Sequence, residues 1–346
     1  MLRSCYLKLM NVILVVFLLI STVDTSRANS LKVILSAEEV SRLIPEIEAA
    51  EKRLLNIRID SEAWMEEATS PSGPWERTRV HVTATSWFNG LPKNKSRVDI
   101  HSEILRVRYE DLDNYSYIEQ NYTASYDGEF GRIIYHKYGN VGNPSYVKRG
   151  TVLSKAPSIF NGRRTGVVTG LRFTTNYFFA DRTDIESFSQ YFKIAISPKA
   201  LELDSFEFVR EEYDGIDCIR FSFKGSKSVR MSWWFDPSRG FALLEYKKIR
   251  KNEEGVEFTA ERIKVNKLKK VLDDIWWPVE GTVESYKHKQ GESYTRTVYR
   301  ASNVVANDSN FDESIFYVSF PGGYLIDDKV TGRKYRVGEY PNTPKD

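Results

Sequence analysis

Cysteine and histidine are scarce in this chain of 346 residues. The two cysteines are Cys5 and Cys218, and the four histidines are His81, His101, His136 and His288. No H-E-x-x-H or C-x-x-C motif occurs. His81 and His101 fall on strands that we expect to pair, but two strand histidines are more typical of a solvated face than of a metal site. The sequence therefore predicts no bound metal and no cofactor.

Catalytic motifs are also missing. There is no G-x-S-x-G nucleophile elbow, and Gly128 and Gly131 belong to a predicted hairpin rather than to a phosphate-binding loop. The acidic pairs Asp273-Asp274 and Asp327-Asp328 are typical of turns. A glycan-active hydrolase needs two carboxylates that face each other across a cleft. The sequence alone does not show which carboxylates converge in space, so this function stays an alternative. We predict no catalytic residue.

The chain has no concentrated charge of one sign. The net charge is +3, and residues 1–30 carry Arg3, Lys8 and Arg27 against Asp24, which leaves the remainder near +1. Nucleic-acid-binding domains gather basic residues on one face, whereas here both signs alternate along the chain. We therefore expect no nucleic-acid partner.

The longest apolar run lies at the N-terminus. Arg3 and Lys8 precede the run Leu9 to Ile20, and small or polar residues follow up to Ser30. This layout is typical of a secretory signal peptide, and the run is shorter than the roughly 20 residues of a spanning helix. We expect cleavage near residue 30 and a mature chain in the periplasm or cell envelope. With Cys5 removed, that chain cannot form an internal disulfide.

Two helices are expected. Ser36 and Glu39 have the spacing of a capping box, and apolar residues from Val40 to Leu54 then recur at helical spacing, with a kink expected at Pro45. Thr183 and Glu186 repeat the box spacing before a second, short helix, which Pro198 ends. Both helices present an apolar stripe that must pack on another element.

Strands dominate the rest, in keeping with 13% aromatic residues. Alternating patterns predict strands at 80–88, 98–104, 118–126, 132–138, 203–211, 216–224, 227–235, 241–250, 255–267, 278–288, 293–304 and 315–320, and a hairpin over 324–337. Tight turns such as Asn89-Gly90 and Asp127-Gly128 make neighbouring strands antiparallel. We predict a mostly β (α+β) fold: one domain over 31–338, an irregular insertion at 139–172 and a tail at 339–346.

Two helices cannot cover so many strands, so the sheet should curl into a half-open barrel with a concave apolar face. Large apolar residues share one side of consecutive predicted strands. These candidate ligand-lining residues are Phe206, Phe208, Ile219, Phe221, Phe223, Val229, Met231, Trp233, Phe235, Phe241 and Leu243. Such a face can hold an apolar ligand. A core filled by the same side chains is the alternative, because interiors are normally close-packed.

The order helix, meander, central helix, meander resembles the LolA/LolB-type fold of envelope lipoprotein carriers. The segments that carry the resemblance are Leu54 to Ile57, Trp233 to Gly240, Asp273 to Pro278 and Phe320 to Gly323. A half-barrel fold of this kind also occurs in secreted planctomycete proteins of unknown function. The resemblance implies a half-barrel closed by helices that holds an acyl chain. This chain is longer than a minimal carrier, and no binding residue of that family matches a position here.

These observations favour a non-enzymatic exported protein that binds an apolar small molecule, such as a lipid, or a lipidated protein. The envelope membrane surface is a further possible partner, and we expect a monomer. The alternatives are an envelope interaction or scaffold module with a filled core, and the glycan-active hydrolase considered above. The volume of any cavity under the helices distinguishes the first two.

Overall fold

The structure is a computed structural model that describes residues 32–70, 72–89, 95–108, 115–154, 188–198, 206–224, 229–252, 254–273, 275–285 and 294–338. The expected signal peptide and the C-terminal tail lie outside these ranges. Within them, no helix combines the length and the apolar character needed to cross a bilayer.

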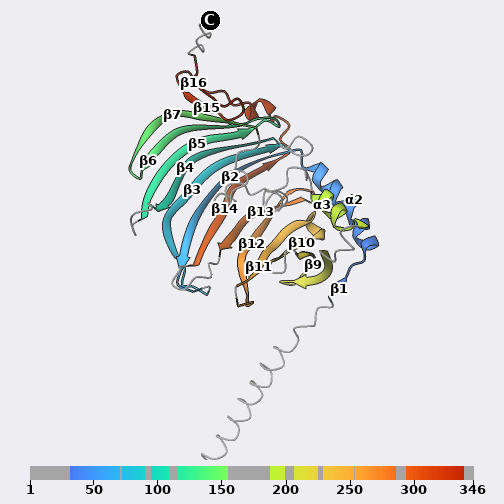
Figure 1. Cartoon of the computed structure of the whole chain (residues 1–346). Coiled ribbons are helices and arrows are strands. Elements are labelled where there is room, and N and C mark those ends of the chain that lie inside the picture. The colour runs from blue at the N-terminus through green and yellow to red at the C-terminus, as the bar shows by residue number, and fades with distance from the viewer. Residues whose placement is uncertain are drawn as a thin grey trace, which may run out of the picture.

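One mixed, mostly antiparallel sheet of sixteen strands forms the body of the described chain (Figure 1). In chain order the strands are β1 Val33–Ile34, β2 Asn56–Ala68, β3 Glu76–Asn89, β4 Ser96–Arg108, β5 Tyr115–Tyr126, β6 Gly131–Asn140, β7 Asn143–Leu153, β8 Phe206–Tyr213, β9 Ile216–Lys224, β10 Val229–Asp236, β11 Ala242–Lys251, β12 Glu257–Leu272, β13 Ile275–Ser285, β14 Tyr294–Ala306, β15 Leu325–Asp328 and β16 Arg333–Arg336. The predicted fold class is confirmed.

Two meanders make up the sheet. The spatial order runs β1, β8 to β14, then β2 to β7, then β15 and β16, so β14 lies antiparallel beside β2. This single junction joins segments that are more than two hundred residues apart in the sequence. β15 pairs with β7 in parallel, and β16 is the last strand. The sheet curves visibly in Figure 1.

The helices are α2 (Ala37–Arg53) and α3 (Phe188–Ala195). The capping box at the start of α2 is present: Ser36 Oγ accepts the Glu39 N–H, and Glu39 Oε2 accepts the Ser36 N–H at 2.8 Å. The helix continues through Pro45, which is exposed. The expected capping box of the second helix lies outside the described residues.

The two faces of the sheet differ in chemistry. We call the face covered by α2 and α3 the inner face. Its main core joins Val40, Ile44 and Ile47 of α2 and Phe192 of α3 to a row of side chains across the strands. That row runs Phe208, Phe221, Trp233, Tyr246, Ile263 and Val283 in direct register. A second buried cluster, around Val98, Ile100 and Tyr122, has all its members on β3 to β6.

The outer face carries alternating charges. One row reads Arg262, Glu284, Arg296, Glu66 and Arg77 across β12, β13, β14, β2 and β3. Opposite charges directly across a strand pair stabilise the pairing. Arg296 Nε lies 2.6 Å from Glu66 Oε2, and the Arg296 and Arg77 guanidinium groups stack on Trp75 and Trp64.

The C-terminal segment packs on the outer face. A 3-10 helix, η4 (Glu313–Phe316), carries Glu313, which binds Lys95 Nζ at 2.9 Å, and Phe316 is fully buried. The strand predicted at 315–320 is therefore wrong, because Asp312 caps this helical turn through its side chain. The predicted hairpin over 324–337 is confirmed as β15 and β16.

The irregular segment expected over 139–172 needs correction in its first part. β7 is a regular strand from Asn143 to Leu153, whereas residues beyond 154 lie outside the described ranges. Two of the glycines that suggested a loop are required by the local structure, one by its backbone angle and one by a close contact. Gly142 has φ 89° in the turn between β6 and β7. At Gly150, an added Cβ would lie 2.3 Å from Cε1 of Phe320.

Candidate functional site

The predicted ligand-lining residues come together on the inner face of β8 to β11. Seven are buried core members: Phe208, Ile219, Phe221, Trp233, Phe235, Phe241 and Leu243. Phe206, Phe223 and Met231 pack at the border of this core, and Val229 is partly exposed at the strand end. Their rings stack closely, with centroids 5.1 Å apart for Phe221 and Trp233. The sequence grouped these residues correctly, and whether they contact a ligand stays a prediction.

The two helices fill the space above these residues. Phe192 of α3 is fully buried and lies 5.0 Å from Phe208 and 5.5 Å from Phe221, centroid to centroid. Along α2, Val40 and Ile47 are 0% and 1% exposed. An apolar chain can reach this part of the inner face only if α2 or α3 moves.

Polar contacts hold α3 against α2. Ser189 Oγ donates to Glu51 Oε2 at 2.7 Å, and Lys193 Nζ lies 2.5 Å from Glu48 Oε1. The Lys193 ammonium group lowers the pKa of Glu48, so the pair remains charged at neutral pH. The Lys193–Glu48 pair is largely exposed, so water screens it and it contributes little to stability. Ser189 is buried, so its hydrogen bond to Glu51 satisfies a polar group inside the helix contact.

A pocket opens beside the C-terminal half of α2. Its volume is about 480 Å³, within the range typical of ligand sites. The lining residues are Glu46, Ala49, Ala50 and Arg53 of α2 and Pro237, Ser238, Gly240 and Phe241 of the β10–β11 turn. Ala50 and Phe241 are both buried, so the floor of the pocket is the edge of the core. Glu46 and Arg53 supply charges of both signs.

The β10–β11 turn forms one wall of this pocket. It contains η3 (Pro237–Arg239), and Asp236 Oδ1 accepts the Ser238 N–H at 2.9 Å. Gly240 and Phe241 follow with φ values of 66° and 58°. Positive φ is strained for a bulky residue such as Phe241. The turn thereby places Phe241 against the pocket, and the Arg239 guanidinium lies over the Trp276 ring.

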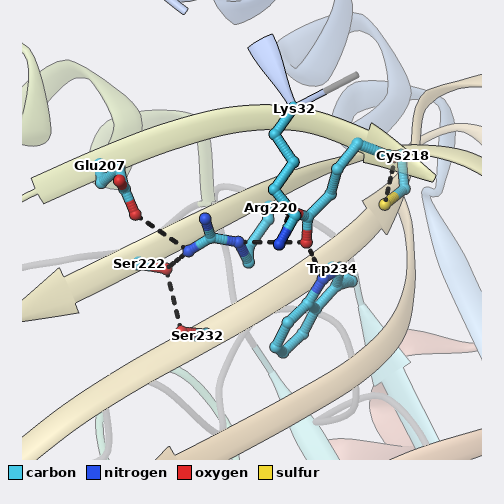
Figure 2. Close-up of polar contacts among 8 residues, drawn as sticks. Lys32, Glu207, Cys218, Arg220, Ser222, Ser232 and Trp234 are labelled. Atoms are coloured by element: carbon cyan, nitrogen blue, oxygen red, sulfur yellow. Dashed lines mark hydrogen bonds and ion pairs between the residues drawn. The ribbon is translucent and has the colours of Figure 1, made fainter. Parts of the chain in front are cut away.

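A polar network covers the outer face of β8 to β10 (Figure 2). Arg220 Nε lies 3.1 Å from Glu211 Oε1, which also accepts the Trp234 Nε1–H at 2.7 Å. Arg220 reaches Glu207 as well, at 3.0 Å. Lys32 Nζ lies 3.6 Å from Glu211 Oε2. Because Glu211 is almost fully buried, the loss of a cation beside it would leave an uncompensated buried charge, which is strongly destabilising.

The other residues considered from the sequence are dispersed. His81 lies 3.7 Å from Glu62, whereas the His101 ring is hydrogen-bonded to Thr85 and the His136 ring to Thr123. His288 and Asp274 lie outside the described residues. In the described ranges, no group of three or more His, Cys, Asp or Glu side chains is placed to hold a metal ion.

Three members of the two acidic pairs lie within the described residues, and they lie at or beside turns. The Asp273 side chain is 98% exposed, Asp327 pairs with Lys329, and Asp328 accepts the N–H groups of Val330 and Thr331. Glycoside hydrolysis needs two carboxylates facing a common cleft. None of these three carboxylates lines the pocket beside α2.

The pocket residues on α2 and in the β10–β11 turn, apart from Phe241, were not predicted as site residues. They are separated by nearly two hundred residues and meet only because α2 crosses this turn. The one sequence signal was the Asp236-Pro237-Ser238-Arg239-Gly240 turn, which we interpreted as a family resemblance rather than as a pocket wall.

Two solved structures are similar to this one over most of its length. A domain from Vibrio parahaemolyticus, described as an outer membrane lipoprotein-sorting protein, matches with a TM-score of 0.39 and 11% identity, covering 81% of this chain and 97% of that chain. A DUF1329 family protein from Desulfovibrio piger matches with a TM-score of 0.35 and 12% identity, covering 81% and 96%. No family model and no curated protein matches the sequence. At these identities the two matches concern the fold alone.

Proposed function

We propose that this protein is a non-enzymatic, exported protein that binds an apolar chain, such as a lipid or the acyl group of a lipidated protein. The observation that carries the proposal is the pocket beside α2. Its floor, formed by Ala50 and Phe241, continues into the apolar core under the helices. An acyl chain placed there would exchange water for apolar contacts, which is the main driving force for binding such ligands.

The rim of the pocket fits a polar head group. Arg53 lies in the last turn of α2 and lines the pocket together with Glu46. A carboxylate or phosphate at the end of an acyl chain would pair with the Arg53 guanidinium, which offers several donors in a fixed geometry. The proposal therefore predicts a preference for anionic amphiphiles over neutral ones.

Filling the pocket tests the proposal directly. Ala49 lines the pocket and is exposed, so Ala49→Phe should occupy part of its volume without disturbing the core. We expect this variant to weaken binding of a dansylated fatty acid by about tenfold or more, measured by fluorescence titration. Ser41→Phe is the matched control, because Ser41 is exposed on the same helix and does not line the pocket. Equal binding by both variants and the parent chain would show that the pocket is not the site.

The head-group preference has its own test. Arg53→Gln should weaken binding of the fatty acid and leave binding of its neutral methyl ester nearly unchanged. An equal loss for both ligands would mean that Arg53 supports the fold of the pocket rather than the ligand. Purified protein that carries no lipid by mass spectrometry and binds neither probe would contradict the proposed function as a whole.

An interaction or scaffold module with a filled core is the second candidate. The tight packing of Phe192 against Phe208 and Phe221 favours it, since a rigid core needs no ligand. Hydrogen exchange of α2 distinguishes the two functions. A bound acyl chain should change the protection of residues 46–53, whereas a scaffold should show the same protection with and without the probe.

A further inference from the structure

The sheet ends in a basic edge formed by β7, β15 and β16, at the top of Figure 1. Six exposed cations lie on these strands and their turn: Lys148, Arg149, Lys329, Arg333, Lys334 and Arg336. The only acidic residues in the same strands are Asp327 and Asp328. Asp327 is paired with Lys329, and Asp328 is engaged by the N–H groups of the turn. The edge therefore has a clear positive excess.

Exposed apolar side chains lie at both ends of the same edge, because β15 runs parallel to β7 from Arg149 to Val152 and its turn lies at the end of β7 away from the β6–β7 tip. Tyr138, Val141 and Tyr146, at the β6–β7 turn, are 47%, 40% and 82% exposed. Leu325, Val330 and Tyr335, on and between β15 and β16, are 37%, 43% and 38% exposed. These six are nearly half of the thirteen large apolar side chains that are exposed in the described ranges. The Lys137 ammonium lies 5.5 Å from the centre of the Tyr146 ring.

The two kinds of side chain are interleaved. Leu325 stands in register between Arg149 of β7 and Arg336 of β16. Along β7, Tyr146 precedes Lys148 and Arg149 by two and three residues, which corresponds to about 10 Å or less. A flat partner that spans the length of β7 can therefore contact the side chains at both ends of the edge together.

Protection of the sheet edge explains only part of this pattern. Lys and Arg on an edge strand discourage pairing with another chain, which accounts for the charges of β16. Protection of the edge does not account for Tyr146 and Val141 at the hairpin tip. Exposed apolar side chains there lower solubility and do not prevent strand pairing. The opposite end of the sheet has the reverse balance, with five acidic and three basic residues between Phe206 and Lys224.

We propose that the β7–β15–β16 edge, with the β6–β7 tip, is a docking surface for an anionic lipid bilayer. Tyrosine favours the membrane–water interface, and Lys or Arg near the surface contribute attraction to anionic head groups. Val141, Leu325 and Val330 add aliphatic contacts that a lipid interface accepts and that a nucleic acid does not. In this orientation the acidic end of the sheet points away from the membrane.

Vesicle sedimentation of the purified chain tests the proposal. We expect binding to phosphatidylcholine vesicles that contain phosphatidylglycerol, weak binding to phosphatidylcholine alone, and loss of binding at high salt because screening shortens the range of the charges. The double variant Lys148→Glu/Arg149→Glu should reduce binding by at least about tenfold. Tyr146→Ser should reduce binding that persists at moderate salt.

Arg250→Glu/Lys251→Glu is the matched control, since it makes the same charge change at exposed, neighbouring positions on β11. Equal loss in the two double variants would overturn the assignment to this edge, as would equal binding to neutral and anionic vesicles. Binding of polyglutamate in place of vesicles would show that the edge takes an acidic polypeptide and would also overturn the proposal. Circular dichroism confirms that each variant is folded. Fatty-acid binding at the α2 pocket is measured separately, so the failure of one proposal leaves the other intact.

Discussion

Asp127 shows how a single carboxylate organises the β5–β6 hairpin. Its Oδ1 atom accepts the N–H groups of Glu129 and Phe130 at 3.0 and 2.8 Å, and its Oδ2 atom pairs with Arg132. Burial alone would raise the pKa of Asp127, but these hydrogen bonds and the Arg132 charge outweigh it and lower the pKa. A lowered pKa in the folded state means that ionised Asp127 stabilises the fold.

We expect Asp127→Ala to lower the free energy of unfolding by about 1–3 kcal/mol at neutral pH, because backbone donors lose a charged acceptor. The contribution is present above the unfolded-state pKa of about 4 and disappears as the pH falls through the lower folded-state pKa. Urea unfolding at several pH values should therefore show the parent and the variant converging in acid. Asp217→Ala, at an exposed site on β9, is the control that should change little.

Cys218 is the one cysteine of the described chain, and its surroundings make it unreactive. Burial, with the nearby Glu211 and Asp217 charges, raises the pKa of its thiol to about 12. The thiolate is the reactive form, so almost none is present at neutral pH. We expect no labelling by Ellman's reagent in the native protein and, for a chain that starts at residue 31 and so lacks Cys5, one labelled thiol after denaturation. Rapid native labelling would contradict the buried strand environment.

At the scale of elements, the C-terminal segment depends on a contact that only glycine permits. Phe320 and Ile326 pack directly over Gly150, leaving no room for a Cβ atom. We expect Gly150→Val to release the segment from η4 to β16 and to increase its proteolysis and hydrogen exchange. Gly322→Ala is the matched control, since an added Cβ there meets no atom within 4 Å. Unchanged protection in Gly150→Val would mean that other contacts hold the segment.

The elements that the sequence predicted best are those with a local signal. The capping box at Ser36 identified the start of α2, and the β5–β6 and β15–β16 hairpins followed from their turns. β2 was not predicted: the large apolar residues Ile57 and Ile59 lie at its start, and the inner face then continues with the small residues Ser61 and Ala63. β7 was missed because the close approach of Phe320, a long-range contact, requires a glycine that sequence alone assigns to a loop.

At the scale of the whole molecule, the apolar face of the sheet was predictable and the pocket was not. Period-two patterns place Phe221 and Trp233 on one face whatever their neighbours are. The pocket depends on where α2 crosses the β10–β11 turn, and no local pattern encodes that crossing. The same holds for the basic edge, whose charges are spread over β7, β15 and β16 and meet only through the parallel pairing of β15 with β7.

The junction of β14 with β2 has a consequence for how the chain is made. β2 is synthesised early, and β3 can pair with it at once, but the other edge of β2 must wait until β14 has emerged. During that interval an open strand edge and the apolar side chains of Ile57 and Ile59 are available to any neighbouring chain. The sheet can therefore close on that side of β2 only after residues 294–306 have been synthesised.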